Sequence, residues 1–344
     1  MKQIWIPRIG EPSVLELRES PDLEPGPGEV RIAVEAAGVN FADAMARMGL
    51  YPDAPPLPTV VGYEVAGDID ALGEGVDPEL LGKPVVAMCR FGGYSSKVCV
   101  PANQVGIRPE GLDAVTAAAI PVVGTTAWMM IEIMGRVREG DRVLVHSAGG
   151  GVGLMALDLL KRRGAYAIGT ASPGKHEFLR ERGYDQLIDY RSQDFEAVLQ
   201  GEPGLDLILD PIGGAAWAKG LRLLRAGGRI ICFGMSANAT SSTRSPLAVL
   251  KNMASVPWFQ SNPIALINQN KGVMGVNMGH MWDEGERVAG WMRELLSLWE
   301  SGEIRPHVHA TVPFENASEA HRILHARENF GKVILVTEPA RPTA

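Results

Sequence analysis

The chain has 344 residues, 46% of them hydrophobic and 21% charged, and its formal net charge is −7. This length is sufficient for two ordinary domains, and the composition is that of a globular protein. Affinity for a nucleic-acid backbone depends on clustered Lys and Arg, so the net negative charge argues against a general nucleic-acid partner.

The apolar runs are too short to predict a membrane span. The run from Val115 to Val123 contains Pro121 and has fewer than the roughly 20 residues that cross a bilayer. Prolines and charges near the start of the chain do not fit a signal peptide. The three cysteines are odd in number and widely spaced, which disfavours a disulfide framework. We therefore expect a cytoplasmic protein with reduced thiols.

Short β-rich segments separated by Gly and Pro fill residues 25–100, which indicates an all-β lobe. From about residue 140, β-rich runs alternate with amphipathic helical runs, as in a doubly wound parallel sheet of an α/β fold. The last third adds helices at 286–302 and 317–328, and a strand at 332–338 that we expect to return to the first lobe. The polar stretch 236–245 predicts an exposed loop.

A glycine-rich turn follows the β-run 143–145 and precedes an amphipathic helix. Three small residues in it have the A-x-G-x-x-G spacing of a dinucleotide-binding turn. The first permits the tight turn, the second lets the backbone approach a pyrophosphate, and the third allows close packing of helix and strand. Backbone N–H groups at the helix start would then meet the phosphates. The turn comprises Ala148, Gly149, Gly150, Gly151, Val152 and Gly153.

The residues after the next β-run favour NADPH over NADH. Enzymes that use NAD place an Asp or Glu about 20 residues after the turn, where it holds the ribose 2′-hydroxyl. Here the run 166–170 is followed by Ala171, Ser172, Pro173, Gly174 and Lys175, without a carboxylate. Ser172 can donate a hydrogen bond and Lys175 carries a positive charge, which suits a 2′-phosphate. The alternative is that Lys175 is a solvated residue near a helix start.

Several further segments match one protein family in order. They are GVNFAD at 38–43, GLYP at 49–52, PxxxGYEVAG at 58–67, PxxGTTA at 121–127 and LDPIGG at 209–214. With these segments the chain resembles the zinc-independent quinone oxidoreductases of the medium-chain dehydrogenase/reductase superfamily. Its last third is most similar to the vesicle amine transport protein homologues, and the resemblance extends over about residues 1–338.

The resemblance implies a two-domain architecture. A GroES-like β-rich catalytic domain would be formed by residues 1–122 and 266–344, and a Rossmann domain that binds NADPH by residues 123–265. A cleft between the two would hold the nicotinamide and the substrate. Members of the family are often homodimers or homotetramers paired through the Rossmann domain, so the resemblance implies an oligomer, and we expect a homodimer.

The chain departs from the zinc alcohol dehydrogenases of the same superfamily. Where those relatives have Cys, His and Cys as catalytic zinc ligands, this chain has Asn40, Tyr63 and Val122, which cannot form the N/S site that zinc needs. His307 and His309 form an HxH pair without a nearby third ligand. We therefore expect no bound metal, whereas a zinc alcohol dehydrogenase would contain stoichiometric zinc.

The resemblance also assigns residues to the chemistry. Without zinc, charge on the substrate oxygen must be offset by hydrogen-bond donors or water. Tyr51 matches a tyrosine proposed as proton donor in enoyl thioester reductases, although it may simply line a turn as an aromatic residue. Asn40 and Asp43 lie in a segment that lines the cleft, and Asp43 may equally stabilise the fold. Tyr63 should face the cleft even if it takes no part in the reaction.

Further residues match cofactor contacts of the family. Thr126 resembles a threonine that approaches the nicotinamide ring, and Tyr190 a tyrosine that packs near the adenine ribose phosphate. Segments that flank the nicotinamide are represented by Phe233, Gly234, Val276 and Asn277.

The expected activity is NADPH-dependent reduction of a quinone or an activated alkene, such as an enone or alkenal, by hydride transfer. One alternative is a dedicated enoyl thioester reductase acting on enoyl-CoA or an acyl carrier protein. Another is an NADPH-binding module with little turnover. The sequence does not separate the reductase from the binding module, because the cofactor turn is common to both. A basic entrance for the carrier phosphate would favour the enoyl thioester reductase, and none is clear in the sequence.

Overall fold

The computed structural model describes residues 1–236 and 261–337. Residues 237–245 of the predicted polar loop lie outside this part of the chain. The chain divides into two compact units. Unit 1 comprises Met1–Thr125 and Met278–Ala344, and unit 2 comprises Thr126–Asn277.

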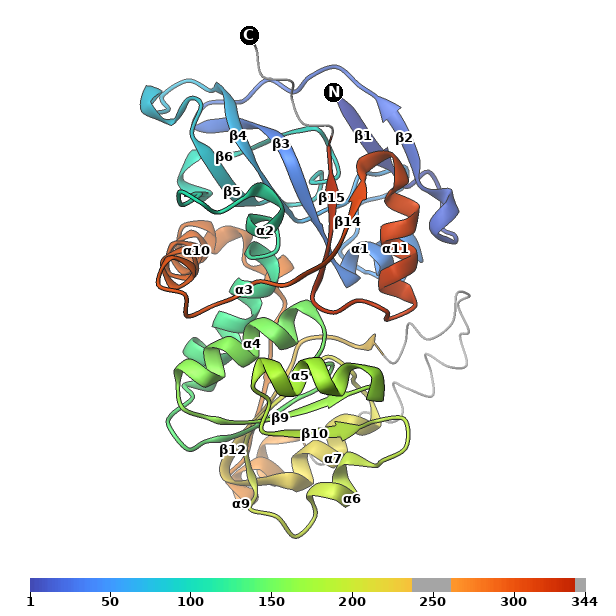
Figure 1. Cartoon of the computed structure of the whole chain (residues 1–344), viewed down its shortest axis with the longest axis vertical. Helices are drawn as coiled ribbons and strands as arrows, with labels where there is room; N and C mark the ends of the chain where they lie inside the picture. Colours follow the sequence, from blue (N-terminus) through green and yellow to red (C-terminus); the bar gives the residue numbers. More distant parts are fainter. Residues whose placement is uncertain (237–260, 338–344) are drawn as a thin grey trace. The chain divides into compact units, whose positions relative to one another are not determined.

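Unit 1 is built on a seven-stranded sheet (Figure 1). Its centre is β3 (Glu29–Val39), whose side chains alternate between buried and partly exposed along the first half of the strand, as one buried face requires. β3 pairs antiparallel with three neighbours, β4, β6 and β15. The strands of this sheet, in its order, are β14 (Val308–Pro313), β15 (Lys332–Val336), β3, β4 (Glu64–Leu72), β5 (Pro84–Met88) and β7 (Val105–Ile107), with β6 (Lys97–Pro101) beside β3.

The C-terminal strand β15 lies directly against β3, as expected, so unit 1 is closed by both ends of the chain. A two-stranded sheet and four α-helices complete its described part. These elements are β1 (Lys2–Trp5), β2 (Glu16–Glu19), α1 (Phe41–Arg47), α2 (Ala114–Ala117), α10 (Gly285–Glu300) and α11 (Ala317–His325). One apolar cluster joins β3, β4, β5 and β15 through side chains such as Ile32, Val65, Val85 and Leu335.

Unit 2 contains a six-stranded sheet in which every pairing is parallel. Its order is β10 (Gln186–Asp189), β9 (Tyr166–Ala171), β8 (Arg142–Val145), β11 (Leu205–Asp210), β12 (Leu224–Cys232) and β13 (Gly272–Gly275). The order runs in opposite directions on the two sides of β8, so a switch point lies at its carboxyl end, where ligands bind in such sheets. The predicted α/β fold with a parallel-sheet domain and a β-rich domain is confirmed.

Helices connect the strands of unit 2, and Figure 1 shows α4 and α5 lying over the sheet. A separate apolar cluster joins the sheet to α6, α7 and α9 through Phe195, Trp217 and Leu266. α3 (Pro121–Trp128) begins in unit 1 and ends in unit 2, where it continues into the π-helical segment η4 (Met129–Gly135). The other helices of unit 2 are α4 (Gly151–Arg162), α5 (His176–Arg182), α6 (Phe195–Leu199), α7 (Ala215–Leu223) and α9 (Pro263–Gln269).

The boundaries of unit 2 differ from the expected range of 123–265. Strand β13 lies beyond residue 265 and pairs with β12 from Arg229–Gly272 to Cys232–Gly275, so the sheet extends to Asn277. Two of the four residues of β13 are glycines, which are depleted in strands. For this reason the sequence pattern did not indicate the strand.

Helical segments follow one another between Ala114 and Gly135, over 22 residues. By length and composition alone this stretch could cross a membrane, and it is longer than the apolar run from Val115 to Val123 that the sequence indicated. Within its most apolar window, 72% is buried inside the protein. A core helix of a globular protein has the same character, and one such helix is weak evidence for a membrane span.

A substitution at Gly67 tests how closely β3 and β4 approach each other. A Cβ atom at this position would collide with the backbone oxygen of Ala33 and lie 2.9 Å from its carbonyl carbon. We expect Gly67→Ala to lower the free energy of unfolding by roughly 1–3 kcal/mol, because the backbone must move. Chemical denaturation measures the change.

The control is Gly290→Ala in α10, where the added Cβ would meet only Arg293 Nη2 at 3.8 Å. This substitution should raise stability by up to about 1 kcal/mol, because alanine favours the helix. A Gly67→Ala protein as stable as the wild type would contradict the described strand pairing.

Candidate active site

The N-terminus of α1 places Asp43 in the interior of unit 1. The Asp43 carboxylate is fully buried and accepts hydrogen bonds from Asn40 N (2.8 Å), Gly62 N (3.1 Å) and Tyr94 Oη (3.1 Å). Burial raises the pKa of Asp43 to about 7, although the hydrogen bonds and Lys332 act in the opposite direction. The carboxylate therefore ties the start of α1 to the backbone beside Tyr63, which favours its predicted fold-stabilising role.

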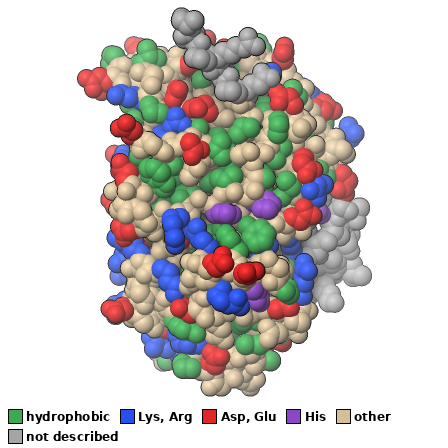
Figure 2. Space-filling view, in the orientation of Figure 1, with side chains coloured by type: hydrophobic (Ala, Val, Ile, Leu, Met, Phe, Trp, Pro, Cys, Tyr) green, Lys and Arg blue, Asp and Glu red, His purple; other side chains and the backbone are tan. Residues whose placement is uncertain are grey.

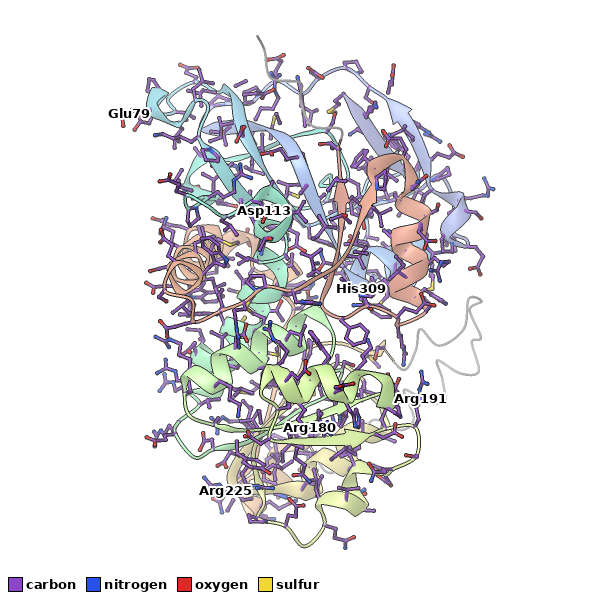
Figure 3. All side chains as sticks on the ribbon, viewed as in Figure 1. Glu79, Asp113, Arg180, Arg191, Arg225 and His309 are labelled. Carbon is purple, nitrogen blue, oxygen red and sulfur yellow. The ribbon has the colours of Figure 1, made fainter. Side chains whose placement is uncertain are left out.

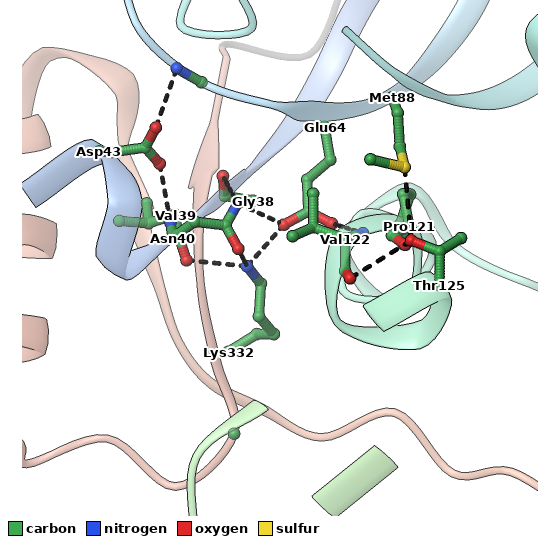
Figure 4. A network of polar contacts seen from close by, with 12 residues as sticks. Gly38, Val39, Asn40, Asp43, Glu64, Met88, Pro121, Val122, Thr125 and Lys332 are labelled. Carbon is green, nitrogen blue, oxygen red and sulfur yellow. Dashed lines mark hydrogen bonds and ion pairs between the residues drawn. The ribbon is translucent and has the colours of Figure 1, made fainter. Parts of the chain in front are cut away.

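A second buried network surrounds Glu64 (Figure 4). Glu64 Oε1 accepts from Lys332 Nζ (2.6 Å) and Asn40 Nδ2 (2.8 Å), while Glu64 Oε2 accepts from Val122 N (2.7 Å). Lys332 Nζ also donates to Asn40 Oδ1 (2.9 Å), so both ends of the Asn40 amide are engaged within the chain. Asn40 and Val122, two of the positions that match zinc ligands in relatives, are thus joined by a carboxylate and an ammonium group.

The donor set does not fit a metal. Neither Val122 nor a protonated Tyr63 offers the nitrogen or sulfur ligands that zinc prefers. Across residues 1–236 and 261–337, no three His, Cys, Asp or Glu side chains are grouped so that they could hold a metal ion. His309, which Figure 3 labels, stacks instead on the ring of Phe330, with ring centroids 5.8 Å apart and 25° between the ring planes.

A directed chain of hydrogen bonds leads from Arg47 to Asp43. Arg47 Nε donates to His321 Nδ1 (3.3 Å), His321 Nε2 lies 3.1 Å from Tyr94 Oη, and Tyr94 donates to Asp43. Because a guanidinium can only donate, His321 must accept at Nδ1 and carry its proton on Nε2. Burial, followed by the charge of Arg47, lowers the pKa of His321 to about 3, so this ring is neutral.

The loop after α1 and the start of β4 bring aromatic rings together. The ring of Tyr51 meets that of Tyr63 edge-on, with centroids 6.3 Å apart, and Phe91 packs 5.0 Å from Tyr63. Tyr51 is partly buried and Tyr63 is buried. Burial raises the pKa of both hydroxyls, so both are protonated and can donate hydrogen bonds at neutral pH.

In unit 2 the glycine-rich turn connects β8 to α4, in the predicted strand, turn and helix arrangement. A Cβ atom on Gly153 would lie 2.5 Å from Ala148 O, so only glycine permits this packing of helix on turn. Gly150 precedes the first residue of α4. The first N–H groups of a helix have no partner inside it and can bind an anion. The turn thus fits a pyrophosphate.

Two cations lie near this turn. A Cβ atom on Gly149 would lie 2.8 Å from Lys175 Cδ, so the Lys175 side chain rests against the turn. Burial, and then the charge of nearby Arg191, lowers the pKa of Lys175. Arg191 follows β10 and is the residue after the exposed Tyr190 (Figure 3). Ser172 stands at the N-cap position of the short helical turn that carries Lys175, and its side chain makes no cap hydrogen bond.

Sequence reasoning missed Arg191. The signal was present, because the carboxyl ends of adjacent parallel strands meet at one edge and β10 neighbours β9. A cation directly after β10 therefore lies close to the residues after β9. What the sequence did not reveal was that β9 and β10 are neighbours.

Other predicted cofactor residues lie at the same edge of the sheet. Phe233 and Gly234 follow β12, while Val276 and Asn277 follow the neighbouring β13. The amide of Val276 donates to Cys232 O (2.9 Å), which holds these two strand ends together. Thr126 is a buried residue of α3, and its contact with the nicotinamide stays a prediction.

The sequence also did not predict a buried polar group formed by His146, Thr170 and Asp210. His146 Nδ1 lies 3.0 Å from Thr170 Oγ1, and His146 Nε2 lies 3.9 Å from Asp210 Oδ2. Neither His146 Nε2 nor Asp210 Oδ2 has a hydrogen-bond partner among the described residues. Burial lowers the pKa of His146. The lone histidine in the β8 run gave no sequence signal for this pair.

The neutral state of His321 predicts a pH dependence of stability. Between pH 6.5 and about 3 the unfolded chain binds a proton at His321, whereas the folded chain does not. Because protonation then favours the unfolded state, the stabilising contribution of the neutral His321 ring is lost as the pH falls. Relative to His321→Gln, the wild type should lose about 1 kcal/mol more between pH 6 and pH 5. Urea denaturation at each pH measures this difference.

The raised pKa of Asp43 acts in the opposite direction, because its contribution is present at low pH and is lost as the pH rises towards about 7. Asp43 is present in both proteins, so the comparison isolates His321. Parallel pH profiles for the two proteins would contradict a neutral His321.

Comparisons with known proteins agree with this description. The family models for the alcohol dehydrogenase GroES-like domain and for the zinc-binding dehydrogenase match residues 26–110 and 182–335. The synaptic vesicle membrane protein VAT-1 homolog of Rattus norvegicus is 38% identical over 334 residues, which cover 96% of this chain and 82% of that protein. A quinone oxidoreductase of Pseudomonas aeruginosa is 31% identical over 340 residues, covering 97% of this chain and 99% of that protein.

The solved structure of Escherichia coli quinone oxidoreductase complexed with NADPH has a TM-score of 0.84 at 28% identity, covering 98% of this chain and 100% of that chain. One matching family model bears a zinc-related name, but Asn40, Tyr63 and Val122 occupy the ligand positions here. The chain therefore belongs to the zinc-independent, quinone oxidoreductase-like family of the medium-chain dehydrogenases/reductases.

Proposed function

We propose that this chain is an NADPH-dependent oxidoreductase that reduces quinones or activated alkenes, such as enones and alkenals, without a metal. The observation that carries the proposal is the anion-binding turn at 148–153 with Lys175 against it and Arg191 beside that lysine. The E. coli quinone oxidoreductase of the same fold was crystallised with NADPH, which supports the choice of cofactor.

Different residues of unit 2 would bind different parts of the cofactor. The backbone N–H groups of the turn would bind the pyrophosphate. Lys175, Arg191 and the Ser172 hydroxyl would bind the 2′-phosphate by charge-assisted hydrogen bonds, with Tyr190 beside it. The nicotinamide would be flanked by Thr126, Phe233, Gly234, Val276 and Asn277.

The residues of unit 1 would assist the acceptor. The cofactor supplies the hydride when bound. Tyr51 is partly buried and keeps its proton, so its hydroxyl can donate to the substrate oxygen and offset the charge that develops there. Asn40 and Asp43 are engaged within the chain and would position the site rather than contact the substrate.

Steady-state assays test the activity. NADPH consumption should exceed background with 1,4-benzoquinone, 9,10-phenanthrenequinone or an alkenal. A clear preference for enoyl-CoA would instead favour the enoyl thioester reductase. Tight NADPH binding without turnover of any acceptor would contradict the proposed activity and favour the binding module.

Lys175 and Arg191 predict a preference for NADPH over NADH. Lys175→Ala and Arg191→Ala should each raise the KM for NADPH by roughly 10- to 100-fold, because a hydrogen bond to a charged group contributes about 1.5–3 kcal/mol. The KM for NADH, which lacks the 2′-phosphate, should change little. Lys161→Ala is the matched control, since Lys161 pairs with Asp185 (2.6 Å) in the same unit. Equal effects on both cofactors would contradict the assignment.

We also propose a homodimer formed through the edge of the unit 2 sheet. Among the described residues, β13 has one neighbouring strand, β12. Val273 on β13 is exposed, and so are Ile264 (71%) and Ile267 (72%) on α9. A second copy related by a two-fold axis would continue the sheet across this edge and cover the three apolar side chains.

Sedimentation velocity tests this interface. The wild type should sediment as a dimer at micromolar concentration and Val273→Lys as a monomer, because the lysine would be placed in an apolar contact. Leu81→Lys, at another exposed apolar residue, should remain dimeric. A monomeric wild type, or a dimeric Val273→Lys protein, would contradict the interface.

The acceptor should be a small molecule. Figure 2 shows Lys and Arg interspersed with Asp and Glu, so the described residues of this face form no continuous basic band for a nucleic acid.

A cytoplasmic location stays a prediction for this chain. The rat relative is named a synaptic vesicle membrane protein.

A further inference from the structure

The backbone around Tyr63 is held from several directions. Gly62 N donates to Asp43 Oδ1 (3.1 Å), and the Tyr63 carbonyl accepts from Cys89 N (2.9 Å). On the following residue, the Glu64 carboxylate is fixed by Lys332. These contacts leave the Tyr63 backbone little freedom.

The facing loop approaches this segment closely. Gly62 has a φ of +101°, and a Cβ atom there would lie 2.6 Å from Tyr94 N, so both the conformation and the contact require glycine. Phe91 in this loop has a φ of +67°, a left-handed conformation that costs an aromatic residue about 1–2 kcal/mol. Its ring packs against Tyr63 at 5.0 Å between centroids. The protein thus maintains a strained residue that helps to hold the Tyr63 ring.

The Tyr63 hydroxyl is buried without a partner. Only 6% of the residue is exposed, and no described group meets Tyr63 Oη in hydrogen-bond geometry, although the Tyr51 hydroxyl is near enough to act on the pKa of Tyr63. Two other buried tyrosines are satisfied, because Tyr94 Oη donates to Asp43 and Tyr184 Oη donates to Gly153 O (2.9 Å). An unpaired buried hydroxyl costs about 1–3 kcal/mol. A ligand that supplies the missing acceptor would remove this cost.

We propose that Tyr63 Oη donates a hydrogen bond to the carbonyl oxygen of the acceptor, as a second donor beside Tyr51. This inference rests on the proposed reductase function. In an enone the hydride bonds to the β-carbon, the electron pair of the C=C bond shifts towards the carbonyl, and the oxygen becomes negative. Tyr63 keeps its proton and stabilises this oxygen. The enolate then takes a proton at its α-carbon from Tyr51 as the C=O bond re-forms, which gives the saturated ketone, and solvent returns a proton to Tyr51.

The arrangement favours acceptors with an oxygen conjugated to the reducible bond. The aromatic rings of Tyr51, Tyr63 and Phe91 form one apolar surface, which suits a planar conjugated system. Two hydroxyls on this surface can stabilise a single developing charge. An alkene without a conjugated carbonyl would place no negative charge near either hydroxyl, so it should not be reduced.

Tyr63→Phe tests the proposal, because it removes the hydroxyl alone. With an enone such as 2-cyclohexen-1-one, kcat/KM should fall roughly 10- to 100-fold, since loss of one donor to a developing oxyanion has an effect of that order or larger. The KM for NADPH should not change. The melting temperature should stay nearly the same, because Tyr63 Oη makes no hydrogen bond of good geometry among the described residues.

Two matched variants complete the experiment. Tyr94→Phe loses a paired buried hydroxyl and should lower the melting temperature. Tyr166→Phe, at a partly exposed position in β9, should leave kcat/KM unchanged.

An unchanged kcat/KM in Tyr63→Phe would overturn the inference, as would a loss of melting temperature as large as that of Tyr94→Phe. Failure of the proposed function is distinguishable, because it would appear as a wild-type protein that reduces no acceptor.

Discussion

The buried ion pair between Glu64 and Lys332 is the contact on which the candidate site of unit 1 depends. Lys332 begins the C-terminal strand, whereas Glu64 begins β4, and the two meet at 2.6 Å. The same carboxylate accepts from Asn40 and from the backbone of Val122. Loss of either charged partner would leave the other buried and unpaired, which costs about 3–5 kcal/mol. This single carboxylate thus joins α1, β15, α3 and β4 around Tyr63.

The ion pair has a chemical consequence. Asn40, Asp43 and Glu64 are all engaged with groups of the chain itself, so none is left to coordinate a cation or to serve as a base. The tyrosyl hydroxyls of Tyr51 and Tyr63 are the polar groups that we propose as donors to a substrate. Unit 2 differs in its charge, because its glycine-rich turn has backbone N–H groups and two cations near it. These positive groups suit a phosphorylated cofactor.

Much of the fold was predictable, because it follows from local patterns. The glycine-rich turn between a strand and a helix, the alternating strands and helices around it, and the return of the last strand were all read from the sequence and found in the structure. Strand β13 was missed because its glycines weaken the strand signal. The apolar helical stretch at 114–135 was underestimated because Pro121, which begins α3, was taken as an interruption.

The site was predictable only in part, because its contacts join distant residues. Nothing in the local sequence relates Lys332 to Asn40, which are 292 positions apart, or Arg47 to His321, which are 274 apart. Arg191 required knowledge of the strand order, and the unpaired Tyr63 hydroxyl required knowledge of every neighbour. Motifs indicated which segments carry the site, but not which of their polar groups are already occupied.

The proposed reaction is hydride transfer assisted by hydroxyls rather than by a metal. The most direct measurement uses NADPH deuterated at C4 with 2-cyclohexen-1-one, after dialysis of the protein against a chelator, and locates the deuterium in the product by NMR. Hydride transfer from NADPH would place deuterium at the β-carbon and hydrogen from solvent at the α-carbon, at a rate that added zinc does not increase. Product without deuterium, or turnover that appears only when zinc is added, would contradict it.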